Sequence, residues 1–176
     1  KADNGDDTAL MVASLKGHFA TMEALLQAGA DIDKAANSGG TALMFASLQG
    51  HTAVAEALIQ AGADVKKAAN DGRTALMWAS LEGHAAIVKS LLQAGADVNK
   101  ADNGDDTALM VASLKGHVAT MEALLQAGAD VDKAANNGAT ALIAASNTGH
   151  AAIVEALLQA GADVNKAAKD GGTALI

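Results

Sequence analysis

The sequence contains no cysteine and no proline. The absence of cysteine excludes disulfide bonds and thiolate metal sites. Because proline is missing, the 18 glycines must shape the turns between elements. Aromatic residues are scarce, since two phenylalanines, one tryptophan and no tyrosine occur among 176 residues. A core must therefore be built from alanine, leucine, methionine and valine, which favours closely packed helices.

Clustered positive charge is also missing, because 20 acidic residues outnumber 12 basic ones and the net charge is −8. Contacts with phosphates need clustered Lys and Arg, so we expect no nucleic-acid partner and no anionic membrane surface. No apolar run approaches the length of about 20 residues that spans a bilayer, and no signal-peptide pattern opens the sequence. The compartment stays unknown from these features, with the cytoplasm expected for a natural protein.

The tripeptide Thr-Ala-Leu recurs every 33 residues and organises the whole sequence. It begins at Thr8, Thr41, Thr74, Thr107, Thr140 and Thr173. After each of the first five, Gly-His and then Gln-Ala-Gly-Ala-Asp follow in constant register. A fixed period in this range is typical of a stacked array. We expect a single repeat array over residues 1–176, with units at 1–33, 34–66, 67–99, 100–132 and 133–165 and a partial unit at 166–176.

The pattern inside each unit predicts two short helices and a projecting loop. Apolar residues at helical spacing follow Thr8, which is a candidate N-cap, and Gly17 ends this first helix. Met22, Leu25 and Leu26 form one stripe of a second helix, which a glycine ends. The next segment is rich in turn-forming residues and predicts a hairpin-like projection, here called the finger. Because neither helix is long enough to be stable alone, stacking must bury their stripes.

This unit resembles the ankyrin repeat, and the resemblance covers the whole sequence. Residues 70–100 read NDGRTALMWASLEGHAAIVKSLLQAGADVNK, in which Gly-His, Leu-Leu and Gly-Ala-Asp-Val-Asn stand in the family register. The family's Pro-Leu-His is replaced by Ala-Leu-Met, which removes a proline that is favourable at a helix start. The resemblance implies an all-α solenoid of stacked helix-turn-helix units with projecting hairpin-like loops. It also implies that partners meet the fingers and the concave face of the first helices.

A second period of 99 residues lies over the first. Units one and four are identical at 31 of 33 positions and differ only at two apolar positions. This fits block duplication or a deliberately assembled array, and the two origins stay open. Both units place an aspartate, Asp6 or Asp105, where the other units have glycine, so we expect strained or shifted turns there. Polar end caps are not recognisable, and we expect that the end units can stack between molecules.

Several side chains recur once per unit and raise the question of chemistry. They are His18, His51, His84, His117 and His150; Asp31, Asp64, Asp97, Asp130 and Asp163; Ser14, Ser47, Ser80, Ser113 and Ser146; and Met11, Met44, Met77 and Met110. Zinc ligands lie within about 2.3 Å of the ion, which one histidine per stacked unit cannot satisfy, so we expect histidines bonded to backbone. We expect aspartates in loop hydrogen bonds, and serines and methionines packed between helices. The sequence indicates no catalytic residue, no metal site and no cofactor.

Positions that vary within the constant frame indicate the binding surface. They lie in the fingers and on the facing side of the first helices, and include Gly40, Arg73, Asp106, Ala139, Val12, Phe45, Trp78, Val111, Ala144 and Asn147. Four leucines recur nearby at a normally exposed place and would form a ridge: Leu15, Leu48, Leu81 and Leu114. Two interpretations of this leucine ridge stay open, exposure as an interface and burial against the next unit.

These features predict a non-catalytic scaffold that binds a protein or peptide by apolar burial on a preorganised surface. The expected contact residues are Phe45, Leu48, Gln49, Arg73, Trp78, Leu81, Glu82, Leu114 and Lys115. Trp and Arg are common among residues that dominate binding energy. The alternative is a structural spacer, or a consensus-like designed array with no partner of its own, which the near-identity of the units favours.

Overall fold

The computed structural model describes residues 7–169 and 171–174 and contains, in this part of the chain, ten α-helices and no β-strand. The first helices of successive units are α1 (Ala9–Lys16), α3 (Ala42–Gln49), α5 (Ala75–Leu81), α7 (Ala108–Lys115) and α9 (Ala141–Thr148). The second helices are α2 (Phe19–Gln27), α4 (Thr52–Gln60), α6 (Ala85–Gln93), α8 (Val118–Gln126) and α10 (Ala151–Gln159). The predicted all-α class is confirmed.

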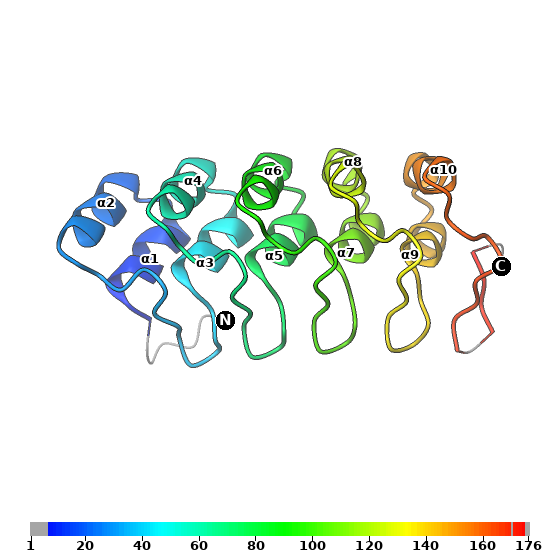
Figure 1. Ribbon diagram of the computed structural model, residues 1–176, viewed down its shortest axis with the longest axis horizontal. Helices are drawn as coiled ribbons and strands as arrows, with labels where there is room; N and C mark the ends of the chain where they lie inside the picture. Colours follow the sequence, from blue (N-terminus) through cyan, green and yellow to red (C-terminus); the bar gives the residue numbers. More distant parts are fainter. Residues whose placement is uncertain (1–6, 170, 175–176) are drawn as a thin grey trace.

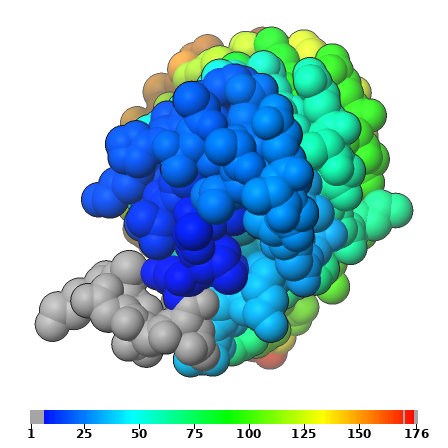
Figure 2. Space-filling model, turned by 90° about the vertical axis from the view of Figure 1, so that its left-hand side faces the viewer, coloured from blue at the N-terminus to red at the C-terminus, as the bar shows by residue number. Residues whose placement is uncertain are grey.

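The five helix pairs stack in chain order along one axis (Figure 1). The fingers project to one side, the second helices line the opposite edge, and the first helices lie between them. Viewed from the N-terminal end, later units extend beyond the outline of the first pair, so consecutive units are displaced from one another (Figure 2). Within the described part of the chain, every helix is too short or too polar to cross a membrane.

A threonine cap begins each first helix. The side-chain oxygens of these threonines accept a hydrogen bond from the backbone N–H three residues later, at 3.3–3.4 Å: Thr8, Thr41, Thr74, Thr107 and Thr140. Helices α1, α3, α7 and α9 end at a glycine in the left-handed region, for example Gly17 at φ 71°. Glycine adopts this conformation without the steric penalty of a Cβ atom. The caps predicted from the sequence are confirmed.

Buried methionines and small residues fill the core between the two rows of helices. Met11, Met44, Met77 and Met110 are at most 5% exposed, as expected for flexible side chains in an interior short of aromatics. The serines also lie among the helices. The Ser14 hydroxyl donates to the Leu10 carbonyl at 2.7 Å, whereas those of Ser47, Ser80 and Ser113 have no hydrogen-bond partner within the described residues.

Histidine side chains join each unit to the one before it. Their Nε2 atoms lie 3.0–3.3 Å from the carbonyl oxygen of the ridge leucine 36 residues earlier, in His51, His84, His117 and His150. The rings also fill the space beside the glycine that ends the preceding first helix. A Cβ atom at Gly50 would clash with the ring of His84. These four histidines therefore have the backbone-bonding role predicted for them, whereas His18 makes no such bond within the described residues.

The aspartate column closes the turn after each second helix. Asp31, Asp64, Asp97, Asp130 and Asp163 each accept a hydrogen bond from the backbone N–H two residues later, at 2.9–3.0 Å. Neighbouring turns are also linked. The side-chain oxygens of Asp33, Asn99 and Asp132 each accept a hydrogen bond from the backbone N–H of the turn aspartate in the next unit, at 2.8–3.0 Å. In unit two the equivalent residue is Lys66, whose side chain has no hydrogen-bond acceptor to offer the Asp97 backbone N–H. A cavity of about 230 Å³ lies beside Lys66.

The fingers are hairpin-like, as predicted, and pair with one another along the array. Side-chain amides of Asn70, Asn103 and Asn136 each donate to a backbone carbonyl in the preceding finger, at 2.7–3.3 Å. The turn at Asp105 is strained and not shifted. Its φ is 61°, against 81–84° at the equivalent Gly39, Gly72 and Gly138. The corresponding Asp6 lies outside the described residues.

Candidate binding site

The leucine ridge runs along the first helices near the turns that lead to the second helices. Leu15, Leu48 and Leu81 are half-buried, and Leu114 is 40% exposed. Neither interpretation drawn from the sequence holds in full, because the ridge is partly covered in three units and open in the fourth. The leucine carbonyls accept the histidine bonds of the next unit, which fixes the ridge in register. The predicted contact residues Gln49, Glu82 and Lys115 are exposed beside it.

Two variable positions face each other across the angle between a finger and its first helix. We call them the finger–helix pairs: Gly40 with Phe45, Arg73 with Trp78, Asp106 with Val111, and Ala139 with Ala144. In unit two the aromatic ring reaches the finger, since a Cβ atom at Gly40 would lie 3.1 Å from Cζ of Phe45. In unit three the Arg73 guanidinium lies 5.0 Å above the centroid of the Trp78 ring. Large side chains therefore fill this angle in units two and three.

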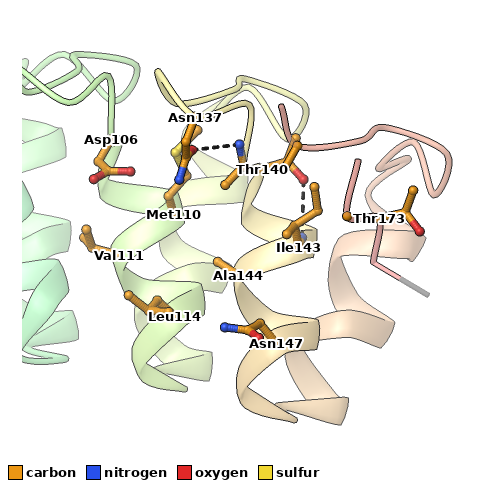
Figure 3. A pocket seen from close by; sticks show the side chains of 13 residues that line it. Asp106, Met110, Val111, Leu114, Asn137, Thr140, Ile143, Ala144, Asn147 and Thr173 are labelled. Atoms are coloured by element: carbon orange, nitrogen blue, oxygen red, sulfur yellow. Dashed lines mark hydrogen bonds between the residues drawn. The ribbon is translucent and has the colours of Figure 1, made fainter. Parts of the chain in front are cut away.

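A hollow of about 530 Å³ lies against α7 and α9, where the finger–helix pairs are small, and Ala168, Gly172 and Thr173 of the segment after α10 complete its lining. Its apolar lining comes mainly from the two helices, through Met110, Val111, Leu114, Ile143 and Ala144. Asp106 and Asn137 lie at its finger side, and Asn147 lies at the opposite end, close to the end of α9 (Figure 3). We call it the α7–α9 pocket. It exists because valine and alanine stand where phenylalanine and tryptophan fill the equivalent angles of earlier units.

The acidic side chains around this pocket differ in how far they are neutralised. Nε of Arg73 lies 3.3 Å from Asp102 and 3.8 Å from Asp71, and these are the two salt bridges of the described residues. Among the same described residues, Asp106 has no salt-bridge partner. Burial raises its pKa above the ordinary value of 3.8, and the carboxylates of Asp102 and Asp105 raise it further, whereas the charge of Arg73 opposes the rise. Asp106 therefore presents a half-buried, unpaired carboxylate to the pocket.

The side chains that line the pocket are mostly apolar, with few ionisable groups. Of the described residues that line it, Asp106 alone is ionisable. In the described part of the chain, no group of three or more His, Cys, Asp or Glu side chains lies close enough to hold a metal ion. An apolar floor with one carboxylate and two amides can bury an apolar group and orient a cation.

The predicted contact residues lie on the first helices, at the end of α5 and in one finger, and Leu114 is the one among them that lines the pocket. Phe45 and Trp78 lie in the filled angles of earlier units. Ala144 and Asn147 also line the pocket, and although both positions vary between units they do not belong to the predicted contact set. The sequence signal for the pocket is the change from Phe45 and Trp78 to the smaller Val111 and Ala144 at the helix member of the finger–helix pairs. A cavity forms where side chains are small, so the large residues of the sequence do not mark its position.

Comparison with protein families gives a match that covers most of the chain. A family model described as ankyrin repeats (3 copies) matches residues 10–102, 61–135 and 99–168. These matches include the two helices that form the pocket. A search of curated proteins finds no match.

Proposed function

The chain belongs to the ankyrin-repeat family, and from this premise we propose that it is a non-catalytic scaffold that binds a protein or peptide. Repeats of this family generally mediate protein–protein interaction. The proposed contact surface is the face formed by the fingers and the first helices. Its contact residues are Phe45, Leu48, Gln49, Arg73, Trp78, Leu81, Glu82, Leu114 and Lys115.

The observation that carries this proposal is an apolar line that stays partly open to solvent in the folded array. Leu48, Leu81 and Leu114 continue along three successive first helices, with Phe45 and Trp78 on the same helices. Contiguous exposed apolar surface often marks an interaction site. The exposed polar residues beside the ridge would form the rim, which tunes partner choice and association rate more than affinity.

The links between units support a preorganised surface. Histidine–carbonyl bonds hold the ridge in register, and hydrogen bonds join successive fingers. A surface that is already ordered loses little conformational entropy when a partner binds. The array therefore needs no rearrangement to present its leucines and aromatic residues together.

A pull-down from a mixed lysate tests this placement. The double variant Leu48→Asp, Leu81→Asp puts two charges on the ridge and should lose the partner, because a buried unpaired charge opposes binding. The matched control is Ala53→Asp, Ala86→Asp, which adds the same charge at exposed positions of α4 and α6 in the same two units. Circular dichroism checks that both variants stay folded.

Each outcome has a defined meaning. A partner held by the parent and the control but released by the ridge variant supports the proposal. A partner that a folded ridge variant still retains contradicts the proposed surface. If no selective partner is captured by any variant, the spacer alternative is favoured, and its stability should then rise steadily as units are added.

A further inference from the structure

We propose that the α7–α9 pocket is the anchor subsite of this face. Its occupant would be a peptide segment of the partner that carries a Lys or Arg next to a large apolar side chain. This inference rests on the proposed function and adds to it the chemistry of the partner. It also moves the centre of binding from units two and three, where the large residues lie, to the junction of units four and five.

The shape of the pocket fits an apolar anchor. Its volume of about 530 Å³ lies within the range of roughly 300–1,000 Å³ that is common for ligand sites in proteins. Val111, Ile143 and Ala144 form an apolar lining, and Leu114 continues it onto the exposed end of the ridge. A large aliphatic or aromatic side chain placed here would bury surface that the array leaves open.

The charge of the pocket selects a cation. Asp106 is the ionisable residue of the described lining, and neither of the two salt bridges involves it. The nearby Arg73 is already held between Asp102 and Asp71, so it cannot pair fully with Asp106. A Lys or Arg of the occupant would supply the missing charge, and the net charge of −8 would favour its approach.

The polar groups of the pocket fit a peptide. Asn147 has no hydrogen-bond partner for its side-chain amide within the described residues, and it lies at the end of the pocket opposite Asp106 (Figure 3). Such an amide both donates and accepts, as a peptide backbone requires. A segment that crosses the pocket would thus meet a carboxylate, an apolar floor and an amide in succession.

The near-identity of units one and four provides an internal comparison. Asp7 and Val12 of unit one correspond to Asp106 and Val111 of unit four. In the following unit, however, Phe45 stands at the place that Ala144 occupies beside the pocket. The unit after the first acidic finger therefore has a large side chain at this place, whereas the unit after the second has a small one. This difference supplies matched substitutions for a test.

The test begins with a random library of 12-residue peptides displayed on phage, selected against the whole chain. We expect enrichment of peptides with Lys or Arg adjacent to Leu, Ile, Met or Phe. Enriched peptides are then synthesised with a fluorescein label, and their dissociation constants are measured by fluorescence anisotropy at low and at high salt. Their affinity should fall as salt rises, because a charge pair at a partly exposed site is screened.

Three variants locate the binding, and a fourth is held as a replacement. Ala144→Phe, which copies Phe45 into the pocket, should weaken binding at least about tenfold by occupying the anchor site. Asp106→Asn should weaken it about tenfold and reduce its salt dependence. Asp7→Asn removes the same charge from the equivalent finger and should leave affinity within about twofold of the parent, as expected for a residue outside the interface. If Ala144→Phe fails to fold, Ala144→Val, which copies Val111, replaces it.

The outcomes separate this inference from the proposed function. Peptides without basic residues, or peptides whose affinity is equal for the parent, Ala144→Phe and Asp106→Asn, overturn the pocket assignment. If those peptides are lost with Leu48→Asp, Leu81→Asp, the proposed face survives without this subsite. If no peptide is enriched on the parent chain, both the subsite and the general binding proposal are contradicted.

Discussion

Thr120 of α8 is predicted to weaken the array, and its replacement by valine to strengthen it. The residue is 1% exposed, and its hydroxyl has no hydrogen-bond partner within the described part of the chain. At the equivalent place, three other units carry Val54, Ile87 and Ile153, each at most 2% exposed. The helix packing therefore accommodates a β-branched apolar side chain at this position, and threonine is the polar exception.

The expected gain follows from the cost of burying a hydroxyl without a partner, which is about 1–3 kcal/mol. Valine has nearly the shape of threonine, so the surrounding packing is kept and no cavity forms. The helix propensities of the two residues are also similar, so the backbone term nearly cancels. We expect Thr120→Val to raise the free energy of unfolding by about 1–3 kcal/mol.

Unit one contains a matched control. Thr21 of α2 occupies the equivalent place in an otherwise almost identical helix, but it is exposed. Its hydroxyl can bond to water, so Thr21→Val should change stability by less than about 0.5 kcal/mol, as is usual for surface substitutions. The comparison separates the effect of burial from the effect of exchanging threonine for valine.

Urea unfolding, followed by circular dichroism and by the fluorescence of Trp78, measures both variants. The two signals must give coincident transitions, because a repeat array does not always unfold in one step. If the slope of the free energy of unfolding against urea concentration is unchanged, the shift in midpoint reports a change in stability alone. The reasoning is refuted if Thr120→Val gains no more than Thr21→Val, or if it lowers stability.

Three further changes test other parts of the frame. Asp105→Gly should raise the free energy of unfolding by about 0.5–1 kcal/mol, because the equivalent Gly72 adopts a positive φ without the steric penalty of a Cβ atom. A lower free energy of unfolding in urea would contradict the strain. Lys66→Asn should restore an acceptor for the Asp97 amide and add about 0.5–1.5 kcal/mol; unchanged hydrogen exchange at that amide would refute it. The raised pKa of Asp106 means that the folded state holds this proton to higher pH than the unfolded state, so the carboxylate destabilises the fold above pH 3.8. Asp106→Asn should therefore be more stable than the parent at pH 7, with the difference shrinking as pH falls through the folded pKa; a difference that is constant with pH would exclude this titration.

The period of 33 residues was enough to predict the helix pairs, their caps and the fingers. Each unit repeats the same local constraints, so a motif such as Thr at a helix start or Gly-His at a turn is specified several times over. Local geometry then follows from residue type, because the threonine cap and the left-handed glycine act within one or two turns of backbone. The strain at Asp105 was also predictable, since glycine at the equivalent positions revealed the conformation required.

Contacts between units were less predictable. The histidine column was correctly expected to bond to backbone, but the sequence does not show that each ring reaches the ridge leucine of the preceding unit. The glycine beside each ring is constrained by that approach as well as by its own φ. Both facts depend on the distance between stacked units, and the stacking distance is set by side-chain packing across the whole interface.

The sequence by itself determined the secondary structure, the order of stacking and the side of each helix that is buried. The exposure of each individual position was decided by the tertiary structure. Thr21 and Thr120 share nearly the same local sequence, yet one is exposed and the other is 1% exposed. Likewise, Leu15 is half-buried, whereas Leu114 is 40% exposed at the edge of a pocket. The physical reason is that the burial of a side chain depends on the surface packed against it. Nearly identical units therefore have different environments where their neighbours differ.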